Sequence, residues 1–156
     1  MILISHRGNI NGPNSAKEND PEYILEALEN YHVEIDVWFI DGQFMLGHNE
    51  PQYNIREEFL ENEKLWCHAK NPEALEIMLQ NTKIHCFWHQ NDDMILTSKN
   101  YIWTYPGKIL TPHSIAVLPE LVMNWDISNV VGVCSDYIEN AKQNSQSLSP
   151  TSSPTT

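Results

Sequence analysis

Short apolar runs alternate with amphipathic segments along most of this chain, and each run has the length of one buried strand. The runs expected to form the main strands are residues 2–5, 32–39, 65–69, 84–88, 101–105, 114–118 and 130–134. The pair Asp41-Gly42 is a hairpin turn signal that returns the chain through residues 43–47. A second hairpin partner is expected at residues 94–98.

Two segments carry the signals of a helix start. Asp20 and Asn71 are N-cap residues, and each is followed by a proline and then a glutamate in the first turn. We therefore expect one helix from Pro21 to about residue 31 and another from Pro72, and the charged segment 55–64 is also expected to be helical. Helical spacing predicts that these apolar residues face the core: Ile24, Leu25, Leu28 and Tyr31 in the first helix, and Leu75, Met78 and Leu79 in the second.

Alternating strands and helices favour an α/β fold whose parallel sheet has right-handed crossovers. Seven candidate parallel strands in one small domain favour a barrel, and a typical (β/α)₈ barrel needs about 250 residues. The sequence of 156 residues therefore predicts a reduced TIM-type barrel with missing or shortened helices. We expect residues 1–142 to form this domain and residues 143–156, which are rich in Ser, Thr and Pro, to form a disordered tail.

Composition narrows the possible partners and the compartment. The formal net charge of −12 argues against a nucleic-acid partner and against an anionic membrane surface. No apolar run is long enough to span a bilayer, and the first residues lack the features of a signal peptide, so we expect a cytoplasmic protein. Cys67, Cys86 and Cys134 lie in strand-like segments and are expected to be buried, reduced thiols. The sequence leaves the oligomeric state open.

Polar side chains collect where the predicted strands end, and the strand ends of a barrel meet at one mouth. They are His6 and Arg7 on the first strand, Glu34 and Asp36 on the second, and His68 and Lys70 on the next. A spacing of two puts Glu34 and Asp36 on one face, where composition alone favours a solvated edge strand. In a closed barrel, however, two unpaired carboxylates are costly, so a metal ion or a basic partner is expected beside them.

Four motifs, His6-Arg7-Gly8, Glu18-Asn19, Glu34-Ile35-Asp36 and Gly47-His48, follow one another in the order and approximate spacing of a known signature. In these motifs the chain resembles the glycerophosphodiester phosphodiesterase family, which belongs to the superfamily of phospholipase C-like phosphodiesterases. The resemblance covers roughly the first 70 residues, and the segment Cys134-Ser135-Asp136-Tyr137 looks like the family's last strand.

The resemblance implies roles for most of these residues. Glu34 and Asp36 would hold one divalent ion, commonly Ca²⁺ or Mg²⁺, with Glu18 near it. His6 and His48 would act as acid and base. The remaining implied roles concern the phosphate: Arg7 would bind its oxygens, and Lys70 would neutralise charge that develops on phosphorus.

The chain departs from the family's pattern at two positions. His68 stands where the family supplies a glutamate ligand. An imidazole there either shifts the preference from Ca²⁺ toward Mn²⁺, Zn²⁺ or another transition ion, or leaves two firm ligands and a weakened site. Asn49 follows His48 where the family has an aspartate. Outside the motifs, Trp103 and Tyr105 share a strand face near the expected mouth, and Trp103 is the predicted substrate contact.

These residues predict a metal-dependent phosphodiesterase that hydrolyses a small glycerophosphodiester-like substrate by two-histidine general acid/base catalysis. One alternative is a degenerate barrel that binds a phosphorylated ligand or a metal without turnover. Another treats Glu34 and Asp36 as the acid pair of a glycosidase, but neighbouring positions on one strand face leave little room for a sugar. The alcohol of the substrate is left open.

Overall fold

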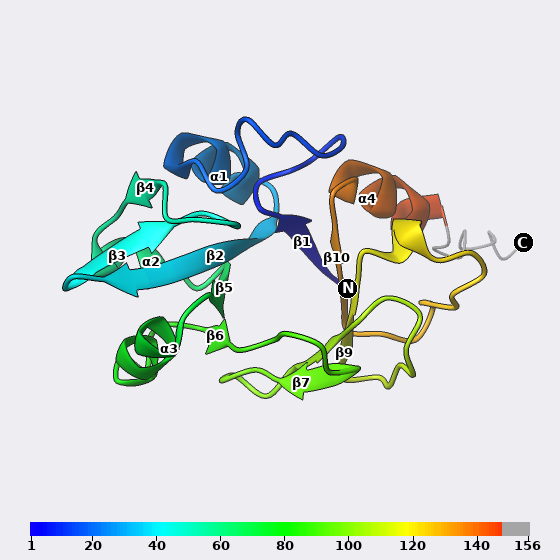
Figure 1. Cartoon of the computed structure of the whole chain (residues 1–156). Coiled ribbons are helices and arrows are strands. Elements are labelled where there is room, and N and C mark those ends of the chain that lie inside the picture. The colour runs from blue at the N-terminus through cyan, green and yellow to red at the C-terminus, as the bar shows by residue number, and fades with distance from the viewer. Residues whose placement is uncertain (148–156) are drawn as a thin grey trace, which may run out of the picture.

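One mixed sheet of ten strands organises the chain, and the computed structural model describes residues 1–147 of it (Figure 1). The strands are β1 (Ile2–His6), β2 (His32–Ile40), β3 (Gln43–Leu46), β4 (Tyr53–Asn54), β5 (Leu65–Ala69), β6 (Cys86–Phe87), β7 (Met94–Leu96), β8 (Ile102–Thr104), β9 (Ser114–Val117) and β10 (Gly132–Ser135). The helices are α1 (Pro21–Leu28), α2 (Glu57–Leu60), α3 (Pro72–Leu79), α4 (Ile138–Ser147) and the short 3₁₀ helix η1 (Pro119–Leu121).

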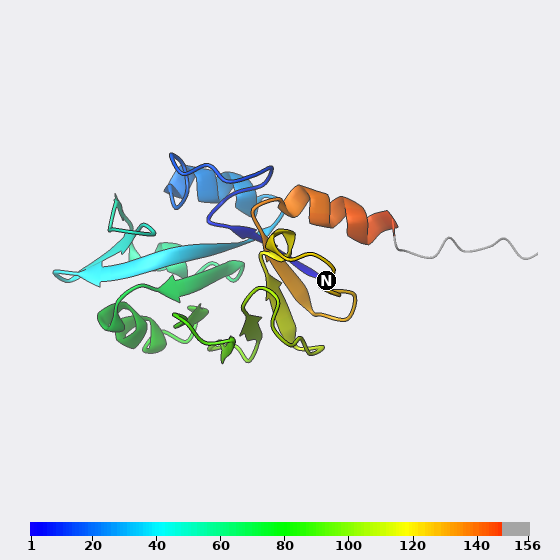
Figure 2. The ribbon, with the colours of Figure 1, turned by 45° about the vertical axis from the view of Figure 1, so that its right-hand side comes forward.

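Seven of the strands run parallel, in the spatial order β6-β5-β2-β1-β10-β9-β8. The hairpin strand β3 pairs antiparallel with the second half of β2, and β7 pairs antiparallel with β8. The sheet curls into an open half-barrel, and α1 and α4 lie at the top of the view in Figure 1 with α3 at the lower left (Figures 1 and 2). All seven predicted parallel strands are present, so the local prediction of strands is confirmed.

The prediction of a reduced TIM-type (β/α) barrel is wrong. Among the described residues no ladder joins β6 to β7 or β8, so the sheet stays open between its two ends. Strand β6 has only two residues, which is too few to continue a ladder around a closed barrel. The connections from β6 to β8, from β8 to β9 and from β9 to β10 contain no α-helix, and η1 is the only regular helical turn within them. The prediction counted the parallel strands and expected missing helices correctly, but it placed these strands in a TIM-type barrel, whereas the sheet stays an open half-barrel.

The outer face of the sheet packs against α1 and α3, and β2 supplies the centre of this layer. Val33, Ile35 and Val37 of β2 are fully buried there. Both predicted N-caps are confirmed, because Asp20 accepts a hydrogen bond from the Glu22 amide and Asn71 accepts one from the Ala74 amide. These caps fix where each helix begins and therefore how it meets the sheet.

Two apolar positions predicted to face the core are exposed instead. Leu25 is 53% exposed and Leu79 is 54% exposed. Each helix has eight residues and contacts the sheet through a narrow stripe, which is formed by Ile24, Ala27 and Leu28 in α1 and by Ala74 and Met78 in α3. The segment 55–64 also forms less helix than predicted, since α2 covers only Glu57–Leu60.

The inner face of the curled sheet has an apolar part and a polar part. The apolar part is a buried cluster that contains Ile4, Trp66, Phe87, Trp103, Ile115, Val117 and Cys134. Because side chains alternate along a strand, Trp66 and His68 of β5 both point inward, and His68 lies nearer the carboxyl end. This apolar cluster therefore lies beneath the polar side chains at the carboxyl ends of the strands.

Three further sequence predictions concern the thiols, the membrane and the tail. All three cysteines are free and buried, and burial raises the pKa of the Cys67 and Cys134 thiols well above the usual value. In the described part of the chain, every helix is too short or too polar to cross a bilayer. Helix α4 extends past the expected domain limit at residue 142, and residues 148–156 of the expected tail lie outside the described residues.

His85 gives the fold a pH dependence that can be measured. It is 4% exposed, its Nε2 lies 2.8 Å from the Thr97 hydroxyl, and its ring centroid lies 4.2 Å from that of Trp66. Burial, with Lys99 and His32 nearby, lowers the pKa of His85 from 6.5 to about 4. Between pH 6.5 and about 4, the unfolded chain binds a proton at His85 and the folded protein does not. The contribution of His85 to the free energy of unfolding is therefore complete above pH 6.5 and is lost as the pH falls toward 4.

We expect urea unfolding to show that wild type loses up to about 3 kcal/mol more stability than His85→Phe between pH 7 and pH 4. The exposed His113 supplies a control, because His113→Gln should lose as much as wild type. Equal losses in wild type and His85→Phe would contradict the assignment of this pH dependence to His85.

Candidate functional site

The register of three neighbouring strands brings the predicted site residues together. In the β1–β2 ladder His6 is paired with Glu34, and in the β2–β5 ladder Asp36 is paired with His68. Glu34 and Asp36 point to the inner face and are 2% and 0% exposed. The alternative of a solvated edge strand, which composition alone favoured, is therefore wrong for this pair, since β2 lies between β1 and β5.

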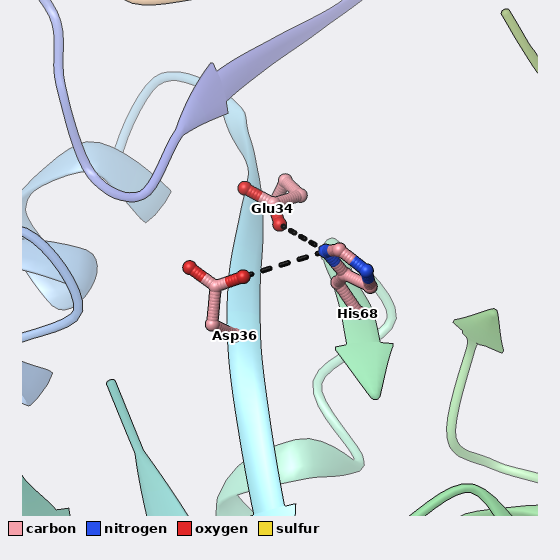
Figure 3. Close-up of side chains that lie close together, drawn as sticks. All are labelled: Glu34, Asp36 and His68. Atoms are coloured by element: carbon pink, nitrogen blue, oxygen red, sulfur yellow. Dashed lines mark ion pairs between the residues drawn. The ribbon is translucent and has the colours of Figure 1, made fainter. Parts of the chain in front are cut away.

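Glu34, Asp36 and His68 form a compact group that could hold a metal ion (Figure 3). Each residue offers one ligand atom, and these three atoms lie within 4.8 Å of one another. Nδ1 of His68 lies 3.8 Å from Oε1 of Glu34 and 3.4 Å from Oδ1 of Asp36. Two carboxylates from one strand and an imidazole from the next thus face a common point.

Asp36 lies among positively charged and hydrogen-bonding groups. Its Oδ2 lies 3.2 Å from Nε of Arg7 and 3.3 Å from Nδ1 of His48, and its Oδ1 lies 3.9 Å from Nζ of Lys70. The Asn19 side chain holds it on a further side, because its Nδ2 donates to Oδ2 of Asp36 and its Oδ1 accepts from the Asp36 main-chain amide, both at 2.9 Å. The structure thus places Arg7, His48 and Lys70, three of the predicted site residues, around one carboxylate.

The two carboxylates differ in their proton affinity. Burial alone raises the pKa of Asp36, but the neighbouring His48 imidazole and the charge of Arg7 hold it well below its usual value. The pKa of Glu34 is raised, first by burial and then by repulsion from Asp36. Asp36 therefore stays ionised, while the repulsion between the two neighbouring acids appears as a higher proton affinity of Glu34.

Unsatisfied atoms and local charge both fit a divalent cation. Among the described residues, Oε2 of Glu34 and Oδ1 of Asp36 are buried without a hydrogen-bond partner. The ion pairs of the site join four carboxylates to two permanent cations and three histidines; the carboxylates are Glu18, Glu34, Asp36 and Asp136, and the cations are Arg7 and Lys70. The carboxylates outnumber the permanent cations by two, and this excess of negative charge favours a bound cation.

His6 is oriented by a residue 130 positions away. Its Nδ1 lies 2.8 Å from Oδ1 of Asp136, and its Nε2 lies 3.7 Å from Oε2 of Glu34. Burial alone lowers the pKa of His6, but the hydrogen bond to Asp136 and the charge of Glu34 outweigh it and raise the pKa. Because the ionised Asp136 only accepts hydrogen bonds, Nδ1 of His6 carries the proton and Nε2 faces the metal-ligand group.

The role of Asp136 could not be found from the sequence motifs. It lies just beyond β10, which pairs with β1 in register, so only this ladder brings it to His6. Asn9 supports it by donating one hydrogen bond to Asp136 at 2.8 Å and another to Glu18 at 2.9 Å. The sequence signalled Asp136 only as a polar residue after the last predicted strand, within a segment that resembles the family's last strand, and not as the partner of His6.

Glu18 contacts Arg7, and Trp103 packs in the apolar cluster of the inner face. Glu18 lies outside the group of three metal-ligand residues, where its Oε2 accepts a hydrogen bond from Arg7 at 3.3 Å. Trp103 is 4% exposed and packs on Phe87 with ring centroids 4.7 Å apart. Tyr105, two residues further along, is 48% exposed, so it is the more accessible aromatic side chain after β8.

His48 reaches the site from the turn that follows β3, and Gly47 shapes that turn. Nε2 of His48 lies 3.3 Å from NH2 of Arg7, and its side chain is 39% exposed. Gly47 has φ 154°, and a Cβ atom there would lie 1.9 Å from the main-chain oxygen of Glu50. The Trp38 indole donates a 2.6 Å hydrogen bond to the Gly47 carbonyl oxygen, which fixes the residue before His48.

Gly47→Ala is expected to destabilise the protein more than Gly42→Ala. Gly42 also has a positive φ, 75°, but nothing lies within 4 Å of an added Cβ, so its substitution adds backbone strain of about 1 kcal/mol. At Gly47 the clash with main chain adds to the strain, and we expect a loss on the order of 3 kcal/mol in urea unfolding. Similar losses for the two variants would show that the turn before His48 relaxes freely.

Comparisons with known proteins add no assignment to this geometry. No family model matches the chain, and neither a curated protein nor a solved structure matches it.

Proposed function

We propose that this protein is a metal-dependent phosphodiesterase that hydrolyses a small, glycerophosphodiester-like substrate with His6 and His48 as its acid–base pair. One observation carries the proposal. The two histidines approach the metal-ligand carboxylates separately, with Nε2 of His6 3.7 Å from Glu34 and Nδ1 of His48 3.3 Å from Asp36. A phosphodiester held at this end of the sheet would meet an imidazole from β1 and another from the turn after β3.

Arg7 and Lys70 supply the positive charge that a phosphodiester requires. Both lie within 4 Å of Asp36, at 3.2 and 3.9 Å, and both side chains are 19% exposed. Their N–H groups can therefore turn from the carboxylate to the nonbridging oxygens of a phosphate without crossing a large distance. A divalent ion on Glu34, Asp36 and His68 would add a Lewis acid that stabilises charge on the phosphoryl group.

The surroundings of the two histidines support a division of the proton transfers. The raised pKa of His6 favours its protonated form, and Asp136 stabilises that form through Nδ1. His6 is therefore assigned as the acid that protonates the leaving alkoxide through Nε2. His48 is assigned as the base, and its Nε2 becomes available when the Arg7 guanidinium, now 3.3 Å away, turns to the phosphate.

One observation favours a second candidate, a site that binds a phosphorylated ligand or a metal without turnover. The Arg7 guanidinium already contacts Glu18, Asp36 and His48. If these contacts persist with ligand bound, Arg7 has a structural role and its guanidinium is not free to stabilise charge on the phosphate in the transition state. Turnover separates the two candidates.

Metal binding is tested by thermal unfolding of chelator-treated protein. Adding a divalent cation at about 100 times its dissociation constant should stabilise wild type by about 2.7 kcal/mol, and Glu34→Gln should lose this gain because it removes a buried ligand. The exposed Glu63 provides the control, since Glu63→Gln changes the net charge equally and should keep the gain. A gain retained in Glu34→Gln would place the ion elsewhere.

Catalysis is tested with an aryl phosphodiester and with glycerophosphodiesters in the presence of divalent cations. His6→Gln and His48→Gln should each lower kcat by about 10²- to 10⁴-fold, because each removes one proton transfer, while the exposed His113→Gln should match wild type. Circular dichroism and urea unfolding of the same variants check the fold. If His6→Gln and His48→Gln each keep the wild-type kcat, the acid–base assignment is refuted. Binding of a metal or a phosphorylated ligand without turnover by wild type would favour the second candidate.

A further inference from the structure

The ring of His68 is held so that one nitrogen has a defined role. Nε2 lies 2.9 Å from the main-chain oxygen of His89, and a carbonyl oxygen can only accept a hydrogen bond. Nε2 therefore carries the proton, and in the neutral ring Nδ1 keeps its lone pair. A second contact fixes the ring plane, because His68 stacks on Phe87 with centroids 5.1 Å apart and planes 11° apart.

That lone pair points toward two acids. Nδ1 lies 3.4 Å from Oδ1 of Asp36, an oxygen that is buried without a hydrogen-bond partner among the described residues. A neutral Nδ1 facing a carboxylate oxygen is repulsive unless a cation lies between them. A metal-ligating histidine in other proteins usually donates its second nitrogen to a carbonyl or carboxylate, which sets the tautomer and the ring orientation. His68 shows this arrangement with the carbonyl of His89.

We propose that Glu34, Asp36 and His68 bind a transition-metal ion, Mn²⁺ or Zn²⁺, in preference to Ca²⁺ or Mg²⁺, with Nδ1 of His68 as the selecting ligand. The inference rests on the metal-binding role proposed above and specifies its ion. Ca²⁺ and Mg²⁺ prefer oxygen ligands, whereas an imidazole suits transition metals and a carboxylate pair suits Mn²⁺ as well. A flip of the ring that offered a different atom would lose the hydrogen bond from Nε2 to the His89 carbonyl.

The test measures binding of Mn²⁺, Zn²⁺, Ca²⁺ and Mg²⁺ to chelator-treated protein by calorimetry, with Mn²⁺ also followed by electron paramagnetic resonance. Wild type should bind Mn²⁺ at least about tenfold more tightly than Ca²⁺, and bound Mn²⁺ should show coupling to a nitrogen nucleus. His68→Glu should lose the nitrogen coupling and reduce the ratio of Ca²⁺ to Mn²⁺ dissociation constants by about tenfold or more, while still binding a cation through three carboxylates.

His89→Gln is the matched variant, because it removes the neighbouring imidazole but keeps the main-chain carbonyl that holds His68. It should retain both the nitrogen coupling and the preference for Mn²⁺. Loss of the coupling in His89→Gln but not in His68→Glu would overturn the assignment of the ligand. Equal affinity of wild type for Mn²⁺ and Ca²⁺ would overturn the preference itself.

The outcome for the proposed function can be read separately. Metal-dependent turnover without a preference that depends on His68 would overturn this inference and leave the phosphodiesterase proposal standing. A preference for Mn²⁺ without turnover would support this inference and count against the phosphodiesterase. Absence of any binding at this group would remove both.

Discussion

Two carboxylates buried side by side on one strand set the main constraint on this structure. Glu34 and Asp36 are 2% and 0% exposed, and an ionised acid in such a place is unstable unless positive charge and hydrogen bonds surround it. The chain meets this requirement with Arg7 and Lys70 and with three histidines, drawn from β1, β5 and the segments that follow β1, β3 and β5. The order of the central strands therefore determines whether the acids can be tolerated.

Strand β2 meets that constraint because its two faces differ. Val33, Ile35 and Val37 pack outward against helices, while the acids between them point inward. The apolar half secures β2 between β1 and β5, and its position there brings His6 and His68 beside the acids. Packing of the outer layer and chemistry of the inner face are thus two results of one alternating pattern.

The open half-barrel does not disrupt the site, because the site uses neighbouring strands. The ligand group needs only β2 and β5, and the acid–base pair adds β1 and the turn after β3. The missing ladder lies between β6 and the β7–β8 hairpin, on the far side of His68. Near this gap lies Trp103, which the sequence predicted as a substrate contact and which packs in the apolar cluster of the inner face.

The sequence by itself determined the strands, the helix caps and the placement of two acids on one face of a strand. These features depend on neighbours within a few positions, such as Asp20 before Pro21 or the alternation from Val33 to Val37. The motif order also gathered His6, Arg7, Glu34, Asp36 and His48, which the structure brings together.

Only the tertiary structure decided three other points: whether the sheet closes, which residue orients His6, and which nitrogen of His68 faces the acids. Closure depends on how the connections after β6, β8 and β9 place the strands that follow them. These connections contain no α-helix, and their sequence shows no local pattern that specifies the curvature of the sheet. Asp136 meets His6 across 130 positions, and the His89 carbonyl meets His68 across 21. Contacts between residues so far apart follow from strand order and register, and no local pattern specifies these.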